Sequence, residues 1–73
     1  MKLANNEREV LEYIQDGIED SSQIGIFAGL EDAQVKNIME KLEFLGLIRI
    51  TKKPDEYENW SAEILSEDEN NIW

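Results

Sequence analysis

The sequence predicts one small α+β domain, mostly helical, in which three helices are followed by two strands. Seventy-three residues provide one compact core and no more. Apolar residues recur at the spacing of a helix before residue 46 and alternate with polar residues after it. Hydrophobic residues make up 41% of the chain and charged residues 33%, a balance that is typical of a globular protein and too apolar for wholesale disorder.

The first helix is predicted over residues 6–16, with Asn6 as its N-cap. Glycine takes a left-handed cap without a Cβ penalty, so Gly17 is expected to end the helix. The apolar residues of this segment fall on one face of a helix. They are Val10, Leu11, Ile14 and Ile18.

A short second helix is predicted over residues 22–29, with Ser21 or Ser22 as its cap. The third helix, residues 31–45, has the clearest pattern and ends at Gly46. Its apolar stripe repeats at i, i+3, i+4, i+7 and i+10. The stripe consists of Val35, Ile38, Met39, Leu42 and Leu45.

Two strands are predicted after the helices, at residues 47–52 and 60–64, joined by a loop that contains the only proline. Two strands alone are marginally stable in water, so they must pack against the helices. Trp60 is expected to cover the core. We predict a domain over residues 1–65 and an acidic, frayed C-terminal tail over residues 66–73.

Composition narrows the range of functions. The chain has no cysteine and no histidine, so we expect no disulfide, no metal site and no cofactor. No group of residues has a spacing that catalysis requires, and we expect no enzymatic activity. The absence of a long apolar run and of a secretory signal at the start predicts a cytoplasmic protein with no membrane partner.

Charge is unevenly distributed along a chain whose net charge is −10. Residues 1–35 have a net charge of −6 and residues 54–73 a net charge of −7, whereas residues 36–53 have a net charge of +3. Five of the seven basic residues fall in this middle segment, namely Lys36, Lys41, Arg49, Lys52 and Lys53. Affinity for nucleic acid rests on such residues, so the segment favours a nucleic-acid partner that the total charge alone argues against.

Residues 24–48 resemble the core of winged helix-turn-helix DNA-binding domains of the transcription-regulator type. The resemblance is carried by core and turn positions at the family's spacing, namely Gly29-Leu30, Val35, Met39, Leu42 and Gly46-Leu47-Ile48. It implies a three-helix winged helix-turn-helix fold with a C-terminal two-stranded wing, and a third helix that lies in the major groove of double-stranded DNA. It also implies a homodimer on two-fold sites, which in this chain would use the first helix, the N-terminal arm or the tail.

Helix 31–45 carries a polar stripe suited to reading bases. Gln34, Asn37 and Lys41 fall within an arc of about 60° at 100° per residue. Glutamine and asparagine can form hydrogen bonds to adenine, and lysine can reach guanine or phosphate. Ala33 can contact a thymine methyl group. Lys36 is included in the predicted contact set. The alternative is that these residues form an ordinary solvated helix face.

The predicted wing contributes Arg49, Lys52 and Lys53 as contacts to the DNA backbone. The alternative is a charged edge strand that resists pairing with another chain. Members of the family usually have basic residues at the tip of the wing, whereas this chain has Asp55, Glu56 and Glu58 there.

Ile26 and Phe27 are a second departure, because the family usually has polar residues at one or both positions. Either they mark a partner surface, or Gly25 and Gly29 make the second helix irregular.

The sequence is therefore compatible with two functions. The first is a sequence-specific regulator of transcription that binds double-stranded DNA, and the alternative is an acidic protein–protein interaction module: an adaptor, an assembly subunit or an inhibitor of a DNA-binding protein.

Overall fold

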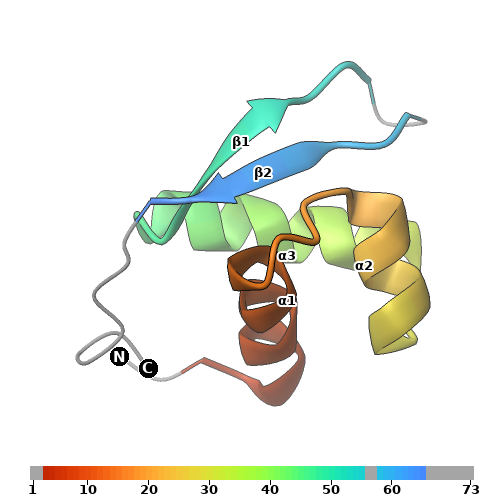
Figure 1. Ribbon diagram of the computed structural model, residues 1–73, viewed down its shortest axis with the longest axis horizontal. Helices are drawn as coiled ribbons and strands as arrows, with labels where there is room; N and C mark the ends of the chain where they lie inside the picture. Colours follow the sequence, from red (N-terminus) through yellow and green to blue (C-terminus); the bar gives the residue numbers. More distant parts are fainter. Residues whose placement is uncertain (1–2, 56–57, 66–73) are drawn as a thin grey trace.

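The computed structural model describes residues 3–55 and 58–65, which form three helices and a two-stranded antiparallel sheet (Figure 1). The elements are α1 (Asn5–Gln15), α2 (Ser21–Ala28), α3 (Asp32–Phe44), β1 (Ile48–Lys52) and β2 (Ser61–Ile64). The predicted fold class, a mostly helical α+β domain with the layout of a winged helix, is confirmed. Predictions for the tail and for Glu56 at the wing tip fall outside the described residues.

The helix starts differ from the predictions because hydrogen bonds, rather than residue type alone, select the caps. The N-cap of α1 is Ala4, whose N–H donates to Glu7 Oε1 at 2.9 Å, so Asn6 lies inside the first turn. The N-cap of α2 is Asp20 rather than a serine, and its Oδ2 accepts from the Gln23 N–H at 3.1 Å. A carboxylate at this position also interacts favourably with the positive end of the helix dipole.

Helix α2 is regular, and its glycine has a packing role. A Cβ on Gly25 would lie only 2.9 Å from the Leu30 carbonyl oxygen, so the turn after α2 approaches the helix too closely for any side chain. Gly29 ends the helix with φ +72°, in the left-handed conformation that glycine adopts without strain. Of the two alternatives left open for this segment, the structure does not have the irregular helix.

The core lies where the three helices meet the inner face of the sheet. Figure 1 shows the two strands lying over α3, with α1 and α2 packed against the same helix. The stripe predicted on α3 is buried up to Leu42, and Trp60 covers the core from the start of β2. The fully buried apolar side chains come from all three helices and β1. They are Val10, Leu11, Ile24, Val35, Met39, Leu42 and Ile48.

Each edge of the small sheet has a polar partner outside the strand pair. Strand β2 pairs with β1 on one side and with the α1–α2 connection on the other, through a bridge between Asp20 and Ser61 and through the Ala62 N–H, which donates to the Glu19 carbonyl at 3.2 Å. On the outer edge of β1, the Ile50 N–H donates to Glu43 Oε2 at 3.0 Å. The wing is therefore fixed to both α3 and the start of α2.

Among the described residues, no helix has the length and hydrophobicity required to cross a membrane.

Candidate interaction surfaces

Four of the five basic residues between positions 36 and 53 form an ion pair with a carboxylate of the described residues, and the fifth lines a hollow with two carboxylates. The most deeply placed is Lys36, whose Nζ lies 2.7 Å from Asp32 Oδ2, one turn earlier on α3. Lys36 is only 5% exposed, and its Nζ is 5.3 Å from the centroid of the Trp60 ring. The prediction that Lys36 contacts DNA needs an exposed ammonium group, and this lysine is instead part of the packing between α3 and the wing.

Lys41 joins α3 to α1. Its Nζ lies 2.7 Å from Glu7 Oε2, and this hydrogen bond, together with the one from the Ala4 N–H, holds the pKa of Glu7 below its usual value. Two of the three members of the predicted base-reading stripe are thus engaged within the protein, because Gln34 Oε1 also accepts from the Glu31 N–H at 3.0 Å at the start of α3.

The basic residues of the wing are also paired. Arg49 forms an ion pair with Glu63, which lies directly opposite on β2. Lys53 Nζ lies 2.9 Å from Glu40 Oε2 on α3 and 4.9 Å from the centroid of the Trp60 ring. The indole ring of Trp60 therefore has an ammonium group from α3 and another from the wing near its face.

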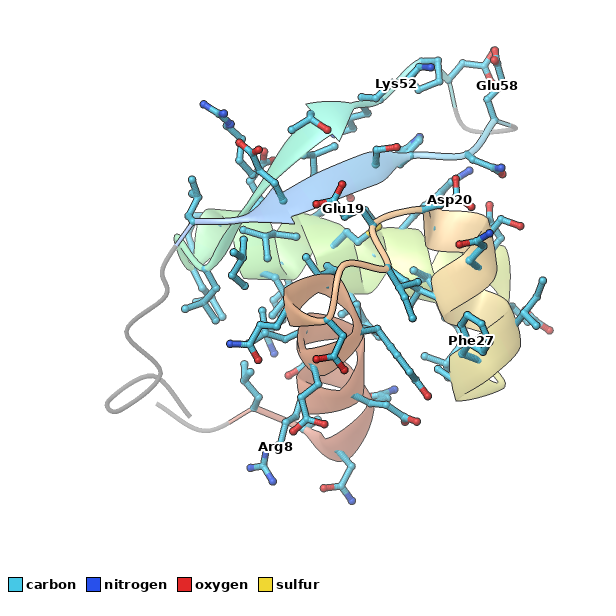
Figure 2. The ribbon with its side chains drawn as sticks, viewed as in Figure 1. Arg8, Glu19, Asp20, Phe27, Lys52 and Glu58 are labelled. Carbon is cyan, nitrogen blue, oxygen red and sulfur yellow. The ribbon has the colours of Figure 1, made fainter. Side chains whose placement is uncertain are left out.

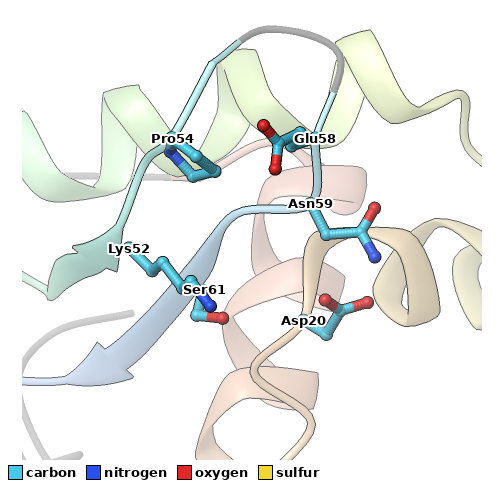
Figure 3. A pocket seen from close by; sticks show the side chains of 6 residues that line it. All are labelled: Asp20, Lys52, Pro54, Glu58, Asn59 and Ser61. Atoms are coloured by element: carbon cyan, nitrogen blue, oxygen red, sulfur yellow. The ribbon is translucent and has the colours of Figure 1, made fainter.

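Lys52 has no ion pair with the residues that the structure describes, yet it also shares its surroundings with acids. It lines a hollow of about 460 Å³ beside the wing, together with the carboxylates of Asp20 and Glu58 (Figure 3). The remaining lining residues are Pro54, Asn59 and Ser61. A phosphate entering this hollow would meet two negative charges and one positive charge.

The face of α3 turned away from the core is less basic than predicted. The four residues at i, i+4, i+7 and i+11 share this face, and all are exposed. They are Ala33, Asn37, Glu40 and Phe44. Phe44 is 89% exposed and was not among the predicted site residues, although its place eleven positions after Ala33 puts it on the predicted reading face.

Helix α2 presents the other exposed apolar surface. Ile26 is 75% exposed and Phe27 57% exposed, and Figure 2 shows Phe27 at the end of α2 that lies away from the wing. The Phe27 ring stands 5.9 Å from the ring of Tyr13 on α1, and the Tyr13 hydroxyl donates to the Phe27 carbonyl at 3.3 Å. We call Tyr13, Ile26 and Phe27 the α2 surface.

Helix α2 and the turn after it stand out for their lack of charge. No residue from Ser21 to Leu30 is ionisable, in a chain of which one third is charged. Within the part of the chain that the structure describes, no group of three or more acidic residues is arranged to hold a metal ion.

Comparisons of the chain with protein-family models, with curated proteins and with solved structures found no match.

Proposed function

We propose that this chain is a winged-helix module that binds another protein, and that the α2 surface makes the contact. The observation that carries the proposal is the exposure of Ile26 and Phe27, side by side in sequence on a helix without charge. Exposed aromatic and aliphatic side chains with no nearby charge are the composition of the centre of a protein interface. The role proposed is one of binding, without catalysis.

The charge pairing favours a protein over DNA as the partner. Exposed ion pairs are worth only about 0–1 kcal/mol each, so a phosphate could displace the carboxylates that hold Lys41, Arg49 and Lys53. Each displaced carboxylate would then remain next to the phosphate. A chain with a net charge of −10 gains little from counterion release under these conditions, and counterion release supplies most of the affinity of proteins for DNA.

Site-specific photo-crosslinking tests this proposal. A photoreactive phenylalanine analogue replaces Ile26 in the full chain, which is expressed in the cells that carry the gene. We expect an adduct with a protein of defined mass, and we expect Phe27→Ser in the same chain to reduce its yield. The matched control carries the analogue at Phe44, an exposed position on α3, and should form no such adduct. An adduct with nucleic acid at position 26, or equal adducts at both positions, would contradict the proposal.

Double-stranded DNA is the second candidate partner, favoured by one observation. Ala33 and Asn37 are exposed on the outward face of α3, and the Asn37 amide has no hydrogen bond to the residues that the structure describes. An asparagine on the exposed face of the third helix is suited to reading adenine in the major groove.

An NMR titration with a generic DNA duplex at low salt separates the two candidates. If the partner is a protein, the amide signals of residues 32–41 and 49–53 should stay in place even without added salt. Shifts that are confined to these two segments and decrease as the salt concentration rises would instead favour DNA as the partner.

A further inference from the structure

We infer that the protein bound at the α2 surface is a second copy of this chain. The inference rests on the proposed function and specifies its partner. Two copies related by a two-fold axis meet through the same residues, so the surface must be compatible with itself. Most of this molecule fails that condition because its surface is strongly acidic.

Charge selects the α2 surface for such a contact. Like charges placed opposite each other across an interface oppose binding, and acids outnumber bases by 17 to 7 in this chain. The ten residues from Ser21 to Leu30 contain neither. Two copies can therefore bring α2 against α2 without placing carboxylate against carboxylate at the centre of the contact.

The apolar side chains on α2 supply the favourable part of the free energy of association. Ile26 and Phe27 from each copy would lose their exposed area to the other copy, which gives four apolar side chains at the centre of the contact. The ring of Tyr13 supports Phe27 in the single chain already. Less side-chain freedom is lost on binding when a ring is held in place beforehand.

Phe44 provides the contrast within the same molecule. It is more exposed than Ile26 or Phe27, but Glu40, Lys41 and Glu43 are its neighbours on α3, so a two-fold contact there would bring acids of both copies together. Exposure alone thus does not make a surface compatible with itself.

The surroundings of the α2 surface predict how salt affects the dimer. Helix α1, which supplies Tyr13, also carries Glu9, Glu12 and Asp16. These acids flank the contact in both copies and repel across it. Salt screens this repulsion and should strengthen the dimer, whereas it would weaken a complex with a basic partner.

The size of the surface predicts a weak dimer. Helix α2 has eight residues and is therefore about 12 Å long. A contact centred on one short helix belongs to the small class of interfaces, which form transient complexes.

Sedimentation equilibrium of the full chain, from about 10 µM to about 1 mM, tests the inference in a range suited to weak complexes. We expect a reversible monomer–dimer equilibrium that shifts toward the dimer between low and high NaCl. Ile26→Asp and, separately, Phe27→Gln should each raise the dissociation constant about tenfold or more. Phe44→Asp is the matched control, since it also replaces an exposed aromatic or aliphatic residue by a polar one, and should leave the dissociation constant unchanged. Circular dichroism of each variant verifies that it is folded.

A chain that stays monomeric throughout this range would overturn the inference, as would a dimer that Phe44→Asp abolishes and the α2 variants do not. A dimer that salt weakens would also overturn it. Failure here is distinguishable from failure of the proposed function. A monomer that still forms an adduct at position 26 with a different protein refutes only the second copy, whereas an adduct with nucleic acid refutes the proposed function.

Discussion

At the scale of the residue, a buried serine connects three elements through hydrogen bonds. Ser21 is fully buried, and its Oγ accepts from the Trp60 N–H at 2.9 Å and donates to Asp32 Oδ1 at 3.4 Å. The other carboxylate oxygen of Asp32 pairs with Lys36, whose ammonium group lies near the Trp60 ring. The chain of contacts runs from Trp60, which directly precedes β2, through α2 to α3, and it provides the buried ammonium group of Lys36 with a carboxylate partner that is itself hydrogen-bonded.

Replacing this serine should weaken the whole fold. Ser21→Ala leaves the Trp60 N–H buried without an acceptor, which we expect to lower the free energy of unfolding by about 1–3 kcal/mol. Urea denaturation followed by tryptophan fluorescence measures the change. Ser22→Ala, the next residue on the same helix, controls for helix propensity and should change the stability by less than about 0.5 kcal/mol. Equal effects of the two substitutions would show that the hydrogen bond contributes nothing.

At the scale of the element, α2 and the turn after it are packed so closely that only glycine fits at position 25. A Cβ there would lie 2.9 Å from the Leu30 carbonyl oxygen and 3.5 Å from Val35 Cγ2 on α3. The first contact is with backbone, which cannot rotate away as a side chain can.

The sign of the effect of Gly25→Ala is therefore opposite to what helix propensity predicts. Propensity alone favours alanine over glycine inside a helix by about 1 kcal/mol. We expect a loss of about 1–3 kcal/mol instead, because the methyl group forces the turn away from α2. Thermal unfolding measures the stability of this variant, and Gln23→Ala, at an exposed site on the same helix, is the control. A Gly25→Ala variant as stable as the natural chain would mean that the turn adapts freely.

Elements were predictable from the sequence to the extent that burial controls them. The spacing of apolar residues placed every helix and strand within one residue of its observed bounds, because a core face must repeat with the period of its element. The caps of α1 and α2 were predicted at the wrong residues. Several neighbouring polar side chains can cap a helix, and the choice among Asp20, Ser21 and Ser22 depends on where β2 arrives in space.

At the scale of the whole molecule, folding removes the charge segregation seen along the chain. Lys41 and Glu7 are 34 positions apart, Arg49 and Glu63 are 14 apart, and Lys53 and Glu40 are 13 apart. Periodicity says nothing about such pairs, because they depend on how elements pack against one another. Only the pair of Lys36 with Asp32, one helical turn apart, could have been recognised from spacing. This is why the predicted DNA-binding segment looked more basic than the folded surface is.

Excess negative charge should limit the stability of the molecule. Helix α1 has no basic residue in its last turn, and Glu12 lies exposed between Glu9 and Asp16. Glu12→Lys changes the net charge from −10 to −8 and places a cation toward the negative end of the helix dipole. We expect the free energy of unfolding to rise by about 0.3–1 kcal/mol at low salt and the gain to shrink at high salt.

Urea denaturation at two NaCl concentrations measures the effect. Glu7→Lys makes the same change in net charge but breaks the pair with Lys41, and should destabilise the protein. If both variants gained stability alike, the total charge alone would be decisive and the pairing of Glu7 irrelevant.

The carboxylate of Glu43, which accepts the Ile50 N–H on the outer edge of β1, has a consequence for assembly. An unpaired strand edge can pair with a strand of another chain, and repeated pairing of this kind produces fibres. Here a carboxylate occupies one of the backbone groups that a second strand would need, and the opposite edge of the sheet is already joined to the α1–α2 connection. The two-fold contact proposed for α2 would instead be closed, because it uses the same surface of both copies and stops at two. By occupying a backbone N–H of β1, Glu43 thus hinders the addition of further strands, which would not be limited to two copies. A variant that lacks this carboxylate is the one to examine for insoluble fibres.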